Sequence, residues 1–124
     1  MAGNTQRTMK MLREGGAMCA VVERWNQYGG LHGVRNDLFG IIDVLAISKE
    51  RGILGIQVCA MSGRAAHLEK LTVDKRDESI AWLQAGGHLE IHAWRKLLVK
   101  RGGKAKRWTA DVTTITLDML GKMR

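Results

Sequence analysis

The strongest constraint in this sequence is a pair of short apolar segments separated by a polar turn. The first covers residues 37–47 and the second covers 52–59, with Ser48-Lys49-Glu50-Arg51-Gly52 between them. Both segments carry Ile, Leu and Val in either phase of a two-residue period, which is typical of strands covered on both faces. The polar stretch and its glycine favour a hairpin turn. We therefore expect a buried β-hairpin around which the rest of the chain packs.

Two polar residues lie inside this apolar hairpin, Asp43 and Gln57. A buried carboxylate is costly unless it is paired or binds a metal. The two-residue period places Gln57 and Cys59 on one face of their strand, and Asp43 can lie beside them across the ladder. Carboxylate and amide oxygens, with a backbone carbonyl between them, suit a hard cation such as Mg²⁺. The structural alternatives are a paired acid and a hydrogen-bonded core amide.

The composition favours a single folded domain that binds a polyanion. The chain has 124 residues, a net charge of +8 and a pI near 10.0, so nucleic acid is the first candidate partner and an anionic membrane surface the second. No apolar run approaches the ~18 residues of a membrane span, and the N-terminus lacks a signal-peptide core. We expect one domain over 1–124, no membrane partner and a cytoplasmic location. Cys19 and Cys59 lie in apolar surroundings and are expected as reduced thiols.

Much of the positive charge lies in residues 95–107, which contain no acid. Such a run favours an arm on the phosphate backbone of nucleic acid, although a solvated loop is the simpler alternative. The candidate nucleic-acid-binding residues are Arg95, Lys96, Lys100, Arg101, Lys104, Lys106 and Arg107.

The remaining pattern predicts a small mixed β-sheet flanked by helices. In chain order we expect a helix over 5–14, a strand over 17–25, a glycine-rich loop over 26–36, the hairpin, a helix from 65 to 84 with a break near 72–74, a strand over 88–94 and a last β segment over 108–117. The apolar phase of that last segment changes between Val112 and Ile115, which predicts a β-bulge.

This layout resembles the PD-(D/E)XK nuclease superfamily, whose restriction-endonuclease-like α/β core is a helix, three strands, a helix and a strand. Ile42-Asp43 resembles the Pro-Asp element of the family, with Ile in place of Pro. Gln57-Val58-Cys59 stands fourteen residues downstream, where the Glu/Gln-x-Lys element belongs. The likeness covers roughly residues 12–94 and is nearest to small phage and archaeal Holliday-junction resolvase-like endonucleases.

The resemblance implies a metal site that binds Mg²⁺ or Mn²⁺. Asp43 would be the principal metal carboxylate, Gln57 a second ligand through its amide oxygen, and the Val58 carbonyl a third. Glu23, at the end of the preceding strand, would supply an additional acid. Asp37 is a further candidate, although capping the turn into the hairpin is the reading we favour for it.

One departure from the family pattern concerns the catalytic cation. Cys59 stands where the family has a lysine, and a thiol cannot supply positive charge. Lys70, or alternatively Arg64, could supply it from the following helix. The function implied is a metal-dependent endonuclease acting on branched or duplex DNA, as a homodimer encoded by a phage. The alternatives are a catalytically inactive DNA-binding protein of the same fold and a basic scaffold protein.

The four histidines do not predict a zinc site. His88 and His92 share a strand face but lie ~13 Å apart at ~3.3 Å per residue, too far to bind one ion. We expect them, with His32 and His67, to be surface or DNA-facing residues. The tryptophans are expected as core or interface anchors, and Trp108, beside the basic run, as the one open to nucleic acid.

Overall fold

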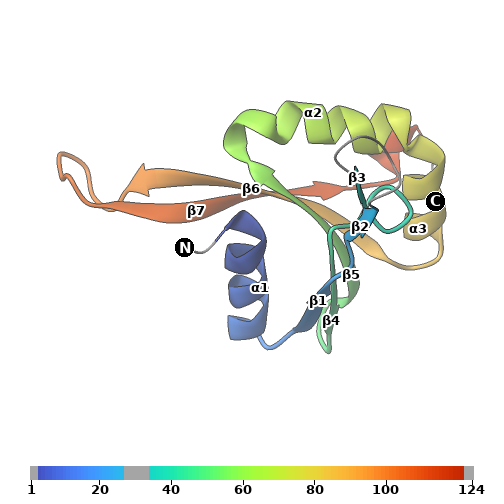
Figure 1. The fold of residues 1–124 in the computed structure, drawn as a ribbon, viewed down its shortest axis with the longest axis horizontal. Coiled ribbons are helices and arrows are strands. Elements are labelled where there is room, and N and C mark those ends of the chain that lie inside the picture. Colours follow the sequence, from blue (N-terminus) through green and yellow to red (C-terminus); the bar gives the residue numbers. More distant parts are fainter. Residues whose placement is uncertain (1–2, 27–33, 122–124) are drawn as a thin grey trace.

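The computed structural model describes residues 3–26 and 34–121, which form a mixed α/β fold (Figure 1). The helices of this part of the chain are α1 (Asn4–Glu14), α2 (Arg64–Glu69) and α3 (Arg76–Gln84). The strands are β1 (Met18–Val21), β2 (Arg24–Asn26), β3 (Val34–Asn36), β4 (Val44–Ser48), β5 (Gly52–Ala60), β6 (His88–Leu98) and β7 (Lys106–Ile115). Three short helical turns complete it: η1 (Met61–Gly63), η2 (Lys70–Asp74) and η3 (Asp118–Leu120).

The main sheet has five strands in the order β1-β4-β5-β6-β7. The predicted hairpin is confirmed as β4 and β5, which pair from Val44↔Ile56 to Ser48↔Gly52. β5 and β6 are parallel, whereas the other neighbours in this sheet are antiparallel. A parallel pair needs a crossover connection, and the segment from η1 to α3 supplies it.

Helices cover both faces of the hairpin, as its two-sided apolar pattern predicts. On one face Met9 and Leu12 of α1 pack against Val44, Leu54 and Ile56. On the other face the crossover segment contributes apolar side chains to a core with strands β5 to β7: Ile41, Ile42, Cys59, Leu71, Ile80, Leu89, Ile91, Ala93, Ile115 and Leu120. Figure 1 shows α1 and the α2–α3 segment on opposite sides of the strands.

The predicted strand over 17–25 is interrupted. β1 ends at Val21, which pairs with Val44 at the first position of β4. The Val22 N–H still donates to the Asp43 carbonyl at 2.8 Å, and the residues before Asp43 then leave the sheet in a tight turn. The chain continues as β2, which pairs with β3 in a separate two-stranded sheet. The predicted glycine-rich loop therefore ends in a strand, and its residues 27–33 lie outside the described part of the chain.

The predicted break in the helical segment is confirmed. η2 is a single π-helical turn over Lys70–Asp74, in which the Lys75 N–H donates to the Lys70 carbonyl at 2.7 Å. Single π turns inside helices occur frequently at functional sites. None of the described helices is long and apolar enough to cross a membrane.

The C-terminal half of the sheet corrects two predictions. β6 continues past Trp94 to Leu98, and β6 and β7 pair without interruption from Leu89↔Ile115 to Leu98↔Lys106. The expected bulge is therefore wrong. Val112 faces the α1 side of the sheet and is exposed, whereas Ile115 is buried on the other face. The apolar residues of β7 therefore lie on different faces of a strand whose register is continuous.

The basic segment, expected as a phosphate-binding arm or a solvated loop, forms the outer ends of β6 and β7 and the turn between them. We call residues 95–109 the basic ribbon. Figure 1 shows that it projects well beyond the body of the fold.

Candidate functional site

Three carboxylates converge at the open end of the β4–β5 hairpin, beside the tight turn that precedes β4. Glu23 follows β1, Asp37 follows β3 and Asp43 precedes β4, and one oxygen from each lies within 4.8 Å of the others. The turn between Asp37 and Asp43 makes this possible, because Leu38 and Ile42 form a bridge across it, with the Leu38 N–H donating to the Ile42 carbonyl at 2.9 Å. We call Glu23, Asp37 and Asp43 the acid cluster.

The hairpin fixes the position of Asp43. Its backbone N–H donates to the Ile56 carbonyl at 2.9 Å, and its Oδ2 accepts from the Val58 N–H at 2.9 Å. The Gln57 Nε2 lies 3.5 Å from Asp43 Oδ1. The predicted proximity of Asp43 and Gln57 is therefore present, and Asp43 is buried with 6% of its surface exposed. The contact seen for Val58 is its N–H, whereas the family likeness implied its carbonyl.

Gln57 has a different orientation from the one that the resemblance implies. Its Nε2 donates to Asp37 Oδ2 at 2.8 Å, and its Oε1 lies 2.7 Å from His67 Nδ1. Because an amide oxygen only accepts, His67 must donate from Nδ1. Gln57 therefore presents its amide nitrogen to the acid cluster and serves there as a hydrogen-bond donor. Asp37 supplies the second oxygen of the cluster, the role that the resemblance implied for the Gln57 amide oxygen.

His67 itself corrects the expectation of a surface histidine. It is partly buried on α2 and positions Gln57. Burial, and then the charge of Lys70, lowers the pKa of His67, which keeps the ring neutral near pH 7. The neutral ring therefore carries its proton at Nδ1, where it donates to Gln57 Oε1.

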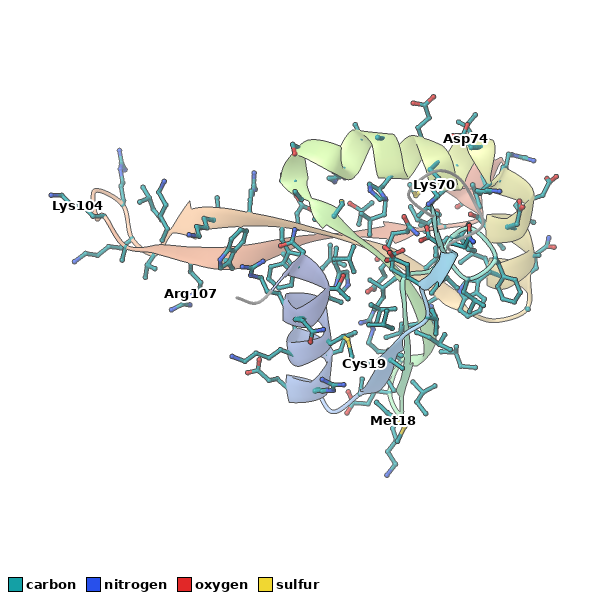
Figure 2. All side chains as sticks on the ribbon, viewed as in Figure 1. Met18, Cys19, Lys70, Asp74, Lys104 and Arg107 are labelled. Carbon is teal, nitrogen blue, oxygen red and sulfur yellow. The ribbon has the colours of Figure 1, made fainter. Side chains whose placement is uncertain are left out.

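Lys70 reaches the acid cluster, as predicted for a substitute cation. Its Nζ donates to Asp37 Oδ2 at 2.5 Å, and the side chain remains partly exposed. It is the first residue of the π turn η2. Arg64, the other candidate, instead donates through Nε and a terminal nitrogen to Thr113 Oγ1 on β7, at 3.0 and 2.8 Å. Figure 2 shows Lys70 at the body of the fold, far along the molecule from the labelled Lys104 of the basic ribbon.

The two aspartates have opposite proton affinities. Burial, and then the hydrogen bond with Asp37, raises the pKa of Asp43 to about 8. Burial also acts on Asp37, but hydrogen bonds from Asp43, Lys70 and Gln57 outweigh it and lower the pKa of Asp37 to about 2. At neutral pH the cluster therefore retains a proton on Asp43 that it shares with Asp37. A proton held between crowded carboxylates is what a bound cation would displace.

Asp37 also corrects a prediction, since we favoured a role in capping the turn. Its backbone carbonyl does accept from the Gly40 N–H at 3.0 Å. Its side chain, however, belongs to the acid cluster. Cys59 is the buried core residue that the sequence predicted, and it and Cys19 are free thiols. Burial, and then the Asp43 charge, raises the pKa of the Cys59 thiol, so it stays neutral.

His92 is buried on the α1 side of the sheet, contrary to the expectation of a surface residue. Its Nε2 lies 3.1 Å from Glu90 Oε1 and its Nδ1 lies 3.3 Å from Thr8 Oγ1. Arg51 donates to the second oxygen of Glu90, and the Trp94 indole donates to Thr8 at 2.8 Å. This network joins α1 to β6 and is fully buried around Thr8, so we interpret it as structural.

The basic ribbon presents cations on both of its faces. Arg95 pairs with Thr109 and Leu97 with Arg107, and these positions share one face of the ribbon. The alternate positions share the other face: Lys96, Leu98, Lys106 and Trp108. Trp108 is 39% exposed, with the Arg7 guanidinium 3.6 Å and the Lys96 ammonium 5.2 Å from its ring centroid. All seven predicted cations are exposed, and Figure 2 shows Lys104 and Arg107 extending from the ribbon.

A comparison with models of known protein families finds no match to this sequence, and neither curated proteins nor solved structures give one.

Proposed function

We propose that this protein is a metal-dependent DNA endonuclease with a PD-(D/E)XK-like core. The observation that carries the proposal is the acid cluster at the mouth of the β4–β5 hairpin, with the Lys70 ammonium hydrogen-bonded to it. The element order supports it as well. A helix, the strands β1, β4 and β5, the α2–α3 segment and β6 follow one another in the order of that core. The inserted β2–β3 pair carries Asp37 into the site.

The chemistry of the donor set fits Mg²⁺ or Mn²⁺. Three carboxylate oxygens within 4.8 Å are hard ligands from separate segments, and the proton on Asp43 marks a position where positive charge is favourable. Asp37, Asp43 and Glu23 would hold the ion. Such an ion would polarise a phosphodiester and lower the pKa of an attacking water.

The remaining groups would position the reactants. Lys70 is partly exposed, so its ammonium can contact a phosphate oxygen while it stays close to Asp37. In the reaction water attacks phosphorus, the bond from phosphorus to one ester oxygen breaks, and that oxygen takes a proton. One product end then carries a phosphate and the other a hydroxyl. Gln57, held by His67, orients Asp37 through its Nε2.

The basic ribbon supports DNA as the substrate. A two-stranded β-ribbon fits the major groove, and exposed cations on both faces suit the phosphates that border it. Gln57 pairs with Ile91, and Lys100 is nine positions further along the chain. At ~3.3 Å per residue the end of the ribbon lies ~30 Å from the acid cluster, a length of about nine base pairs. A duplex along the ribbon would therefore be held about one helical turn from the scissile phosphate.

The preference for branched DNA and the homodimer are parts of the proposal that follow from the resemblance. Two active sites related by a two-fold axis would suit a substrate with two equivalent strands to cut.

A second candidate, a DNA-binding protein of the same fold without cleavage, is favoured by Cys59. This neutral, buried thiol occupies the position of the motif lysine. In that case Lys70 would be a structural partner of Asp37, and the acid cluster would contribute to stability alone.

The test is cleavage of labelled four-way-junction, duplex and single-stranded DNA in Mg²⁺, Mn²⁺ or EDTA. Wild type and Asp43→Ala are compared, with Asp118→Ala as a control, because Asp118 is an exposed acid in the C-terminal turn. We expect metal-dependent cutting that is lost in Asp43→Ala and kept in the control, while salt-sensitive binding survives in all three. Binding without cutting in either metal would overturn the nuclease in favour of the second candidate.

A further inference from the structure

An exposed aromatic side chain stands on the turn that joins two members of the acid cluster. Phe39 lies between Asp37 and Asp43 and is 63% exposed. It contributes little to the core, and nothing about its burial explains a phenylalanine at this place.

The backbone conformation at Phe39 is one that a phenylalanine rarely adopts. Phe39 has φ 57° and Gly40 has φ 76°, and the Ile41 N–H donates to the Leu38 carbonyl at 3.1 Å. Positive φ at both central residues is the combination of a type I′ turn, which favours Asn, Asp or Gly at these positions. A phenylalanine there is strained, and such strain persists mostly where a side chain serves a function.

The surroundings of the turn suit a nucleic-acid strand. A Cβ atom on Gly40 would lie 2.9 Å from Lys75 Cε, so the stem of Lys75 packs against the turn and adds a cation beside it. Phe39 and Trp82 line the same hollow of about 280 Å³, together with Glu78 and Ala81 of α3 and Ala85 directly after it. A nucleobase that leaves the base stack of a bound strand near this turn would contact both aromatic side chains in this hollow.

We propose that Phe39 takes up an unstacked nucleobase next to the phosphodiester that the acid cluster binds, and so selects DNA whose bases are free to leave the helix. The inference rests on the proposed function, because the acid cluster sets the position of the backbone. Phe39 is two positions after Asp37 in the chain, at most ~7 Å away, or about two nucleotide steps of 3.4 Å along a strand. Stacking on an aromatic ring tolerates any base and favours unpaired or branched sites over regular duplex.

The test uses Phe39→Ala, Phe39→Asn and Phe39→Trp, with Val73→Ala as the matched control because Val73 is also 63% exposed. A four-way junction carries 2-aminopurine at successive positions around the branch, and its fluorescence is measured on binding in Ca²⁺, a hard cation that can occupy a carboxylate site. We expect wild type, Phe39→Trp and the control to raise the fluorescence at one position. Phe39→Ala and Phe39→Asn should lose that rise while their Kd changes less than tenfold.

Cleavage in Mg²⁺ gives the second readout. Removing one stacking contact should slow cutting of the junction by at least about tenfold and leave the slow cutting of plain duplex unchanged. Equal fluorescence and equal rates in Phe39→Ala and wild type would overturn this inference while leaving the nuclease intact. A protein that raises the fluorescence but never cuts would overturn the nuclease and retain the role of Phe39 in binding.

Discussion

The proton held by Asp43 predicts an unusual dependence of folding stability on pH. The carboxyl of Asp43 has an ordinary pKa of 3.8 and a pKa of about 8 in the folded chain. Between these two values the folded state holds a proton that the unfolded state has lost. Stability rises with pH only where the unfolded state binds more protons. This group therefore makes stability fall as pH rises from about 4 to about 8.

The size of the effect follows from the same linkage. One proton contributes at most about 1.4 kcal/mol per pH unit, so Asp43 should lower the free energy of unfolding by at most about 3 kcal/mol between pH 5 and pH 7. Asp37 does not interfere. Its depressed pKa contributes stability that is present above pH 3.8 and lost as pH falls toward 2, below this range. His67, with its lowered pKa, acts in the opposite direction to Asp43 and must be cancelled by a comparison.

Asp43→Asn is the variant that makes the comparison. The new amide can still accept from the Val58 N–H through its oxygen and donate to Asp37, but it does not titrate in this range. Urea unfolding of wild type and Asp43→Asn at pH 5, 6, 7 and 8 gives the difference in unfolding free energy at each pH. We expect wild type to lose stability relative to the variant with each step up to pH 8. A difference that stays constant over this range would refute the assignment of a retained proton to Asp43.

Three other perturbations follow from the same structure. Neutralising the ribbon end in Lys100→Gln, Arg101→Gln and Lys104→Gln should weaken DNA binding and reduce the slope of log Kd against log salt by roughly 2 to 3, measured by fluorescence anisotropy; Lys49→Gln, at the β4–β5 turn, should leave the slope unchanged. Lys70→Met should lower single-turnover cleavage by about 10²-fold or more while DNA binding changes little, because the ammonium would act on developing phosphate charge; equal rates would exclude Lys70 from catalysis. Phe39→Asn should raise the free energy of unfolding by about 1 kcal/mol, because Asn tolerates positive φ better than Phe, and a destabilised variant in thermal unfolding would contradict the strained turn.

Sequence reasoning located the centre of the site through a local rule. Asp43 directly precedes β4 and Gln57 lies on the paired strand β5, so the two-residue period and a short turn were enough to bring them together. Lys70 was within reach of the same reasoning because its helix leaves the end of β5. The orientation of the Gln57 amide could not be predicted in this way, because it depends on His67. No sequence pattern indicates whether a histidine will contact the oxygen or the nitrogen of an amide.

Asp37 and His92 show where local patterns stop being informative. The acid of Asp37 reaches the cluster because the following turn runs through two residues with positive φ, one of which is a phenylalanine that gives no turn signal. His92 is buried by Thr8, 84 positions earlier in the chain. A contact of that separation follows from the packing of α1 on the sheet, which the sequence predicted only as a helix.

The basic ribbon was recognised by its charge but not by its structure. The alternation that identifies a strand requires one face to be buried, and beyond Arg95 both faces of β6 and β7 are exposed. The strand pairing continues because the backbone ladder is complete, with Leu98 opposite Lys106. Hydrophobic periodicity therefore does not identify a regular hairpin whose two faces are both exposed.

The most direct test of the central claim is the binding of Mn²⁺ to the acid cluster, measured by electron paramagnetic resonance of the free ion as protein is added. Wild type is compared with Asp43→Asn, Asp37→Asn and Glu23→Gln, and with Glu14→Gln as a control on the exposed end of α1. We expect wild type and the control to bind Mn²⁺ with the same affinity, and each cluster variant to bind at least about tenfold more weakly. Equal binding in all five proteins, or none in wild type at millimolar Mn²⁺, would contradict a metal site at Glu23, Asp37 and Asp43.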